Sequence, residues 1–537
     1  MERRANEMKA VRIESPEKYI NKMKKSITLS EYRASLVVFL FGMCLYFPML
    51  TQRLNCSDGN LCGIFYRSHI DYDIEDIAGR YLLKYFAHMK SMFVFSWMAV
   101  LFGVLCITVG SIFVARIFRI NSTLNVVATG LFFMAAPCFI ENFVCYFAAD
   151  AYLLSFPLTI LAAYLLHEKI TTIRLLFASG CMFVSMASYQ AYIFVTITLF
   201  VFILIRDLLE EQKSWKQIGK KVSCQVASVG IAFVAYVLGN KILKMVGLIN
   251  YQESRFELME LLNPFALIGR IDDTYKAFFD YFFTMNIINN VWKGRHIVNA
   301  VIVALGIILL ILGIYRRKLA KSKILGICGA LLILPLTMMG ISLLYNVNIM
   351  ILPAANLLYV AVISLWEHER FVTDGNIRNV CGWGVYICTI WLIFVMSTYL
   401  CIYQICMKYY VDKTDAMAQR IIMKIEETYP DLGAAPPVFI CGDVDEGNYP
   451  RDYNIEQASY ILIGTQACAG MFVDNMQGYF AGWNAYMAAN LGVEYTKVGE
   501  KAWEIYDSDF YKEMPLFPAD GSIKKNEDGI IVVKMKP

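Results

Sequence analysis

Acids, bases and cysteines gather between Asn55 and Phe86, in the stretch "NCSDGNLCGIFYRSHIDYDIEDIAGRYLLKYF" that follows the first long apolar run of the chain. Asp58 stands nearest to that run. A carboxylate can take a proton from a hydroxyl group, and an arginine can hold a phosphate through two parallel hydrogen bonds. This stretch therefore carries the residue types needed to join a hydroxyl nucleophile to a phosphate-linked group. For Asp58, an ordinary turn in "SDGN" explains the sequence equally well.

The second half of this stretch has helical spacing. From Asp71 onward, one face of the predicted helix carries Asp73, Asp76, Arg80 and Lys84, and apolar residues occupy another face. Such a helix would lie flat on a membrane and present its charges to the water. A solvated surface with an Asp76–Arg80 ion pair is the plainer interpretation.

Two further segments place polar residues between apolar runs. Glu141 and Asp150 bracket "NFVCYFAA", where ionisable groups are costly enough to mark a candidate functional site, although both could be wetted loop ends. Tyr189 and Gln190 stand in "SYQAY" at another predicted helix end, where anchoring at the membrane interface accounts for the tyrosine.

The elements that must position these residues are membrane helices. Of 537 residues, 58% are apolar and 18% charged, and the mean hydropathy is +0.49. These values predict an α-helical polytopic membrane protein and exclude a nucleic-acid binder. About eleven apolar segments are long enough to be transmembrane helices. They are Ala34 to Leu50, Met92 to Ala115, Leu124 to Ile140, Ala151 to Leu166, Leu175 to Ala187, Ala191 to Ile205, Val222 to Val246, Ile297 to Tyr315, Ile324 to Leu344, Ile349 to Leu365 and Cys381 to Cys406. We expect a hairpin or re-entrant pair at Leu175 to Ile205, with "SYQ" at its tip.

The distribution of Lys and Arg predicts the orientation. The arm 1–33 is rich in both and should be cytoplasmic, and alternate loops then follow the positive-inside rule. The membrane domain should cover 34–407, with external loops at 51–91 and 247–296. Residues 408–537 should form a small extracytoplasmic domain, with a helix over "VDKTDAMAQRIIMKIEETY" and strands at "PPVFICGD" and "GIIVVKM". We therefore expect a multi-pass plasma-membrane protein.

Cysteine spacing leaves two external pairs open. Cys56 with Cys62, and Cys441 with Cys468, could form disulfides or remain thiols. A divalent metal also stays open, because Asp and Glu offer hard ligands but no spacing selects a site.

Five segments in order, "SDGNLCG", "YDIEDIAGRYLLKYF", "FAADAYLLSFPLTILAAYLL", "SYQAYI" and "MPLFPADGSIKKNEDGIIVVKM", resemble the bacterial glucosyltransferase family that includes serotype-converting enzymes. The resemblance implies a C-type glycosyltransferase (GT-C) fold. It also implies transfer of a sugar, glucose in this family, from a polyprenyl-phosphate-linked donor to a cell-surface glycan acceptor on the outer face of the bilayer.

The resemblance also implies roles for residues. Asp58 matches the placement of the catalytic base, with Asp71, Asp73, Asp76 and Asp150 in reserve. Arg80 matches the family's Gly-Arg pair, and with Lys84 it would bind the lipid phosphate; Glu141, Tyr189 and Gln190 are further candidates for substrate binding. One departure is the absence of an arginine near "YNVNIMILPAAN", which shifts the expected phosphate binding toward Arg80 and the loop 247–296.

Two other classes compete with this interpretation. A transporter or flippase of a lipid-linked sugar would also have many spans, but it predicts internal repeats and broken helices near the midplane, which the sequence lacks. A non-catalytic scaffold would leave the clustered acids unexplained.

Overall fold

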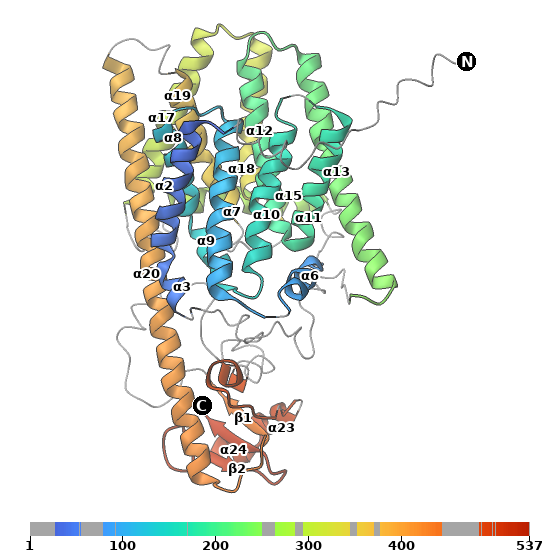
Figure 1. Ribbon diagram of the computed structural model, residues 1–537, viewed down its shortest axis with the longest axis vertical. Coiled ribbons are helices and arrows are strands. Elements are labelled where there is room, and N and C mark those ends of the chain that lie inside the picture. Colours follow the sequence, from blue (N-terminus) through green and yellow to red (C-terminus); the bar gives the residue numbers. More distant parts are fainter. Residues whose placement is uncertain are drawn as a thin grey trace, which may run out of the picture.

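The computed structural model of the protein is a helix bundle with a small α/β unit at one end (Figure 1). It describes residues 27–52, 54, 79–91, 93–168, 170–249, 264–284, 294–343, 352–369, 376–442 and 483–535, apart from 485, 497 and 500. We call the end of the bundle that faces the α/β unit the domain end, and the opposite end the far end.

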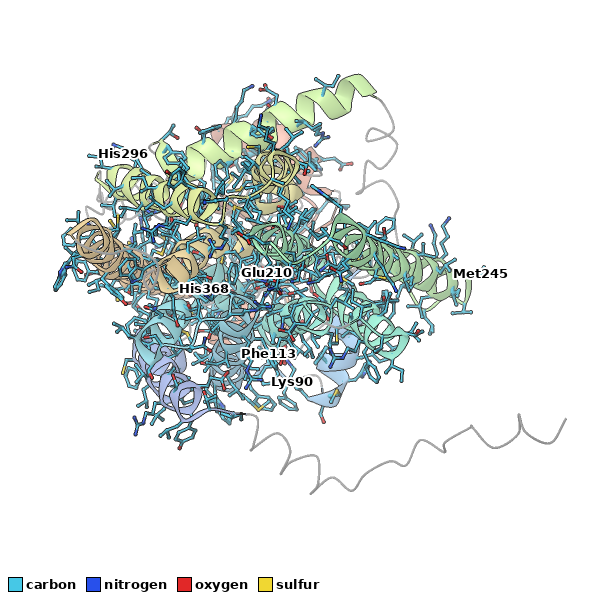
Figure 2. The ribbon with its side chains drawn as sticks, turned by 90° about the horizontal axis from the view of Figure 1, so that it is seen from above. Lys90, Phe113, Glu210, Met245, His296 and His368 are labelled. Atoms are coloured by element: carbon cyan, nitrogen blue, oxygen red, sulfur yellow. The ribbon has the colours of Figure 1, made fainter. Side chains whose placement is uncertain are left out.

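The helices of the first half of the chain run alternately toward the domain end and toward the far end. The elements of this half are α2 (Leu29–Leu45), α3 (Phe47–Thr51), α6 (Leu82–Met89), α7 (Ser96–Ile117), α8 (Thr123–Met134), α9 (Pro137–Val144), α10 (Ala149–Leu165), α11 (Thr172–Ser188), η1 (Gln190–Tyr192) and α12 (Ile193–Leu209). Helix α10 packs between α7 and α11, and α2 packs on α8. In a view along the bundle, the labelled Glu210 and His368 lie toward its middle and Met245 lies at its edge (Figure 2).

The second half completes the bundle and leads out of it. Its elements are α13 (Trp215–Met245), α15 (Pro264–Phe283), α17 (Arg295–Arg316), α18 (Lys321–Met338), η3 (Gly340–Leu343), η5 (Pro353–Asn356), α19 (Leu357–Glu369) and α20 (Asn376–Thr428). Helix α20 has 53 residues and is therefore about 80 Å long, far more than the roughly 30 Å core of a bilayer. It crosses the predicted domain boundary at residue 408 without a break and carries the α/β unit beyond the bundle (Figure 1).

The α/β unit contains a three-stranded sheet in the order β1–β3–β2. Strand β1 (Val438–Cys441) pairs in parallel with β3 (Ile531–Lys534), and β2 (Ile523–Lys525) pairs antiparallel with β3. The unit also contains η6 (Met487–Leu491), α23 (Lys501–Asp507) and α24 (Asp509–Glu513). The predicted strands at "PPVFICGD" and "GIIVVKM" are β1 and β3. Cys441 is buried in β1, and its suggested partner Cys468, like Cys56 and Cys62, lies outside the described residues.

Each of the eleven predicted apolar segments overlaps a helix, but not all of these helices qualify as spans. Among the described residues, six helices are long and apolar enough to cross a membrane, or seven if the bent pair α8 and α9 is one span. Helices α10 and α11 are apolar but shorter. The protein is thus a predominantly helical membrane protein, and the count of eleven spans is not confirmed.

Two local breaks shape the domain end. Tyr189 is extended, with φ −157° and ψ 106°, so α11 and α12 are separate helices and not one long helix. Between α8 and α9 the axis bends by 49°, where Pro137 begins the second helix and cannot donate a main-chain hydrogen bond to the first. Every residue of α9 is buried, so this bend places the polar residues of the helix, Glu141 and Asn142, in the interior of the protein.

Candidate functional site

Arg80 lies in a turn and not on the predicted helix face. Gly79 has φ +72°, and α6 begins only at Leu82. The prediction that Arg80 and Lys84 share one face of a helix that starts near Asp71 is therefore wrong, because the left-handed residue interrupts any helix at this point. A Cβ atom on Gly79 would lie 2.4 Å from the hydroxyl oxygen of Tyr236, so glycine lets the turn pack directly on α13.

Arg80 contacts side chains from α10 and from the segment that joins α11 to α12. Its Nη1 donates to the hydroxyl of Tyr152 on α10 at 2.8 Å, and its Nε lies 3.4 Å from Oε1 of Gln190 in η1. The guanidinium carbon stands 4.7 Å from the ring centroid of Tyr189, which stacks on Tyr152 with centroids 4.4 Å apart. The other end of the Gln190 amide donates to the hydroxyl of Tyr236 on α13 at 2.8 Å. We call Arg80, Tyr152, Tyr189, Gln190 and Tyr236 the Arg80 cluster.

This cluster brings together three of the predicted site residues. Arg80, Tyr189 and Gln190 were selected from two separate motifs, and they are in contact. The break in the helix at Tyr189 makes this contact feasible, because it turns two consecutive side chains toward Arg80. A half-buried arginine among phenols and an amide can bind an anion, and its aromatic rings can stack on a sugar.

Glu141 occupies the interior next to this cluster. Glu141 is fully buried on α9, and its carboxylate is an electrostatic neighbour of both Tyr189 and Tyr399, the latter on α20. The prediction that Glu141 could be a wetted loop end is wrong, because the bend at Pro137 carries it inward.

A second arginine, which the sequence analysis did not single out, shares the neighbour Tyr399 with Glu141. Arg295 is the first residue of α17 and is fully buried. Its guanidinium carbon is 5.2 Å from the ring centroid of Tyr281 at the end of α15, and Arg295 is also an electrostatic neighbour of Tyr359 and Tyr399. Tyr359 donates to Oδ1 of Asn299, one turn along α17, at 3.0 Å. We call Arg295, Tyr281, Asn299, Tyr359 and Tyr399 the Arg295 cluster.

Arg295 supplies an arginine next to a segment in which the sequence lacks one. No arginine stands in "YNVNIMILPAAN", but Arg295 from another helix lies against Tyr359, three residues after the end of that segment. The available signal was its position: an arginine directly before the apolar run Ile297 to Tyr315, at an end that the distribution of Lys and Arg predicts to be external and therefore poor in cations.

The remaining candidates are placed differently. The carboxylate of Asp150 forms an ion pair with Lys90, with 2.7 Å between Oδ2 and Nζ, and both side chains are largely buried. Lys84 lies on α6, half-buried. Asp58, Asp71, Asp73 and Asp76 lie outside the described residues. Within the part of the chain that the structure describes, no group of three or more His, Cys, Asp or Glu residues could hold a metal ion.

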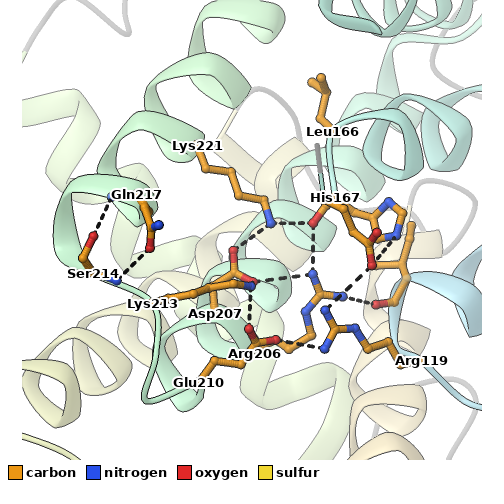
Figure 3. Close-up of polar contacts among 12 residues, drawn as sticks. Arg119, Leu166, His167, Arg206, Asp207, Glu210, Lys213, Ser214, Gln217 and Lys221 are labelled. Carbon is orange, nitrogen blue, oxygen red and sulfur yellow. Dashed lines mark hydrogen bonds and ion pairs between the residues drawn. The ribbon is translucent and has the colours of Figure 1, made fainter. Parts of the chain in front are cut away.

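The far end holds a denser group of charges (Figure 3). Asp207 pairs with Lys213 and Lys221, both at 2.7 Å. Arg206 donates to the main-chain carbonyl of Ile117 at 2.6 Å and to that of His167 at 3.0 Å. The same group includes Arg119 and Glu210, which pair at 2.9 Å. We call Arg119, Arg206, Asp207, Glu210, Lys213 and Lys221 the far-end network. It ties the ends of α7, α10 and α12 to the start of α13, which is a structural role.

The fold and these clusters define the class: a helical membrane protein with a buried arginine and tyrosine site toward one end of its bundle. The family model described as glucosyl transferase GtrII matches residues 77–366, more than half of the chain. The chain belongs to this glucosyl transferase family, which supports a glucosyltransferase role. The match includes Arg80, Glu141 and Arg295, and it begins after Asp58 and Asp76. No curated protein and no solved structure matches the chain.

Proposed function

We propose that the protein transfers glucose from a polyprenyl-phosphate-linked donor to a hydroxyl of a cell-surface glycan, at the external face of a bacterial plasma membrane. In this proposal the domain end is external, the eleven helical segments form a GT-C membrane domain, and residues 408–537 face the acceptor. The far-end loops, with their many Lys and Arg residues, would be cytoplasmic.

The observation that carries the proposal is the Arg80 cluster. It holds a cation among stacked tyrosines at the end of an apolar bundle, within the segment matched by the family. A lipid-linked sugar phosphate needs these three surroundings together: apolar helices for the prenyl chain, a cation for the phosphate and aromatic faces for the sugar.

The proposed reaction is a single displacement. A carboxylate, proposed as Asp58 with Asp71, Asp73 and Asp76 as alternatives, takes the proton of the acceptor hydroxyl. The hydroxyl oxygen forms a bond to the anomeric carbon as the bond from that carbon to the phosphate oxygen breaks, and the electron pair leaves with the polyprenyl phosphate. Arg80, assisted by Lys84, stabilises the leaving phosphate, and the anomeric configuration inverts. Asp150 is less suited to be the base, because Lys90 neutralises it.

The test is sugar transfer by purified protein from a labelled polyprenyl-phosphate glucose to cell-envelope glycan. We expect Asp58→Asn to lose about 100-fold or more of the activity, as removal of a general base does. Arg80→Ala should lose a similar factor. The matched control is Lys244→Ala, which removes an exposed cation at the end of α13 and should transfer as wild type does.

Two results would contradict the proposal. Normal transfer by Asp58→Asn would remove this residue from the mechanism and direct the search to Asp71, Asp73 and Asp76. If the wild-type protein transferred no sugar from any polyprenyl-phosphate donor, then the donor class itself would be wrong.

A further inference from the structure

Arg295 is a buried cation without a hydrogen-bonded partner in the described structure. Nε, Nη1 and Nη2 are all buried, and none of them forms a hydrogen bond of good geometry with a described residue, although the hydroxyls of Tyr281 and Tyr359 lie near enough to interact with the charge. Guanidinium stays protonated in proteins, so it cannot escape the cost of burial by losing its charge. A charge buried without partners is strongly unfavourable, and a ligand that supplies the missing acceptors would offset this cost.

The surroundings of Arg295 are polar but carry little charge. Tyr281, Tyr359 and Asn299 are neutral groups, and Asn299 is held by Tyr359 and by the carbonyl of Phe282. One turn before Tyr359, Asn356 is also fully buried, and neither polar atom of its side chain has a hydrogen-bond partner among the described residues. Each of these two side chains has hydrogen-bond donors that a bound group can use.

An anion with several oxygens fits these donors. A phosphate accepts the two parallel hydrogen bonds of a guanidinium and has oxygens left for an amide and a phenol. The helix that carries Arg295 also indicates how such an anion arrives. Along α17, the exposed face is apolar, with Ile297 59% and Val301 44% exposed, and such a face suits contact with the chain of a lipid.

We infer that Arg295, with Asn356, forms a second phosphate-binding subsite for the lipid-linked donor, an inference that rests on the proposed function. In the donor, the phosphodiester carries one negative charge. When the bond to the anomeric carbon breaks, the departing polyprenyl phosphate gains a second charge. Arg80 holds the sugar phosphate near the aromatic rings, and Arg295 takes the additional charge as it develops. Glu141 is an electrostatic neighbour of one tyrosine in each cluster, so its negative charge limits the positive charge of the empty site.

The experiment measures binding apart from turnover. The full-length protein in detergent is unfolded by heat with and without undecaprenyl phosphate, undecaprenol or inorganic phosphate. We expect undecaprenyl phosphate to raise the melting temperature of the wild type by several degrees, and the other two to leave it unchanged. Arg295→Met should lose this shift and lose transfer at least 100-fold. It should melt no lower than the wild type without ligand, because the uncompensated charge has been removed.

Two further variants keep the result interpretable. Arg295→Lys keeps the charge but loses the planar fork, and it should retain less than half of the shift even if Arg295→Met does not fold. Arg317→Met, at the opposite end of α17, is the control and should keep the full shift. An equal shift in the wild type and both Arg295 variants would overturn the inference while the proposed donor stands. No shift with undecaprenyl phosphate in the wild type would overturn the inference as well, and a wild type that also transfers nothing would overturn the proposed function too.

Discussion

Arg206 is largely buried and Arg295 is fully buried, but the surroundings of the two arginines differ. Arg206, at the far end, donates to two main-chain carbonyls and lies 3.5 Å from the carboxylate of Asp207. Arg295 has the phenol groups of Tyr281 and Tyr359 near it but forms no hydrogen bond of good geometry with a described residue. The fold supplies acceptors for Nη1 and Nη2 of Arg206, though not for its Nε, whereas none of the three nitrogen atoms of Arg295 forms a hydrogen bond with a described residue.

This difference separates stability from function. A charge that the protein itself satisfies joins segments together, as the far-end network joins the ends of α7, α10 and α12 to α13. A charge left unsatisfied lowers stability, and selection retains such a group where a ligand completes it. The comparison therefore predicts that substitutions in the far-end network lower the free energy of unfolding, whereas substitutions at the proposed site lower ligand binding and sugar transfer.

The largest expected effect on stability is at Asp207. Its side chain is 2% exposed and pairs with Lys213 and Lys221, so Asp207→Asn leaves two lysines without their carboxylate. We expect the free energy of unfolding to fall by about 3–5 kcal/mol, measured by denaturant or thermal unfolding in detergent. Transfer per folded molecule should be unchanged, because the network lies at the end opposite to the proposed site.

Asp272→Asn is the matched control for this prediction. Asp272 pairs with Lys276 on the surface of α15, where the two side chains are 62% and 64% exposed, and the pair should contribute less than about 1 kcal/mol. Equal stability losses in the two variants would mean that the far-end network does not hold the helices together, and the comparison with Arg295 would fail.

Gly79→Ala tests whether the Arg80 cluster acts in sugar transfer, as proposed for Arg295, or only stabilises the fold, as the far-end network does. At φ +72°, alanine costs about 1–2 kcal/mol, and its Cβ would also displace the Tyr236 hydroxyl that holds Gln190. We expect transfer by the folded protein to fall about tenfold, equivalent to about 1.4 kcal/mol in the barrier. The kinetic assay is the one described for Arg80.

Gly247→Ala is a control that introduces the same backbone strain without displacing a neighbouring side chain. Gly247 has φ +71°, but a Cβ there meets no atom within 4 Å. This control should therefore lose stability by a similar amount and keep its transfer rate. If Gly79→Ala also kept its rate, the Arg80 cluster would be a structural element like the far-end network.

The sequence could predict the helices and one contact of the site. Apolar runs are local signals, and each one marked a helix. The weak break at "SYQ" correctly separated α11 from α12, and it indicated the side chains that meet Arg80. The strands β1 and β3 were equally visible, because they are short apolar runs between glycine and proline residues.

The sequence indicated the loop 247–296, which contains Arg295, but it could not single out this residue, because the surroundings of Arg295 come from distant segments. Tyr281, Tyr359 and Tyr399 belong to three other helices, and no local pattern shows that they meet. A helix that is apolar on all sides also hides which face is inside, so the burial of Glu141 followed only from the bend at Pro137. The left-handed turn at Gly79 was missed because the helical spacing continues through it.

The smallest expected effect is a pH dependence at Glu210, within the far-end network. Burial alone would raise the pKa of this carboxyl, but the hydrogen bond from Lys213 and the positive charges of Lys213 and Arg119 outweigh burial and hold the pKa below its ordinary 4.5. A lowered pKa in the folded state means that the stabilisation is present above pH 4.5 and is lost as the pH falls through the folded-state pKa.

Glu210→Gln should therefore be less stable than the wild type at neutral pH by under about 1 kcal/mol, since the side chain is 33% exposed. In melting curves taken from neutral pH down to about pH 3, the difference should shrink toward zero. Glu168→Gln, which removes a more exposed acid beside Arg119, should show a smaller difference throughout. A gap for Glu210→Gln that stays constant with pH would show that the contribution of Glu210 does not depend on its charge.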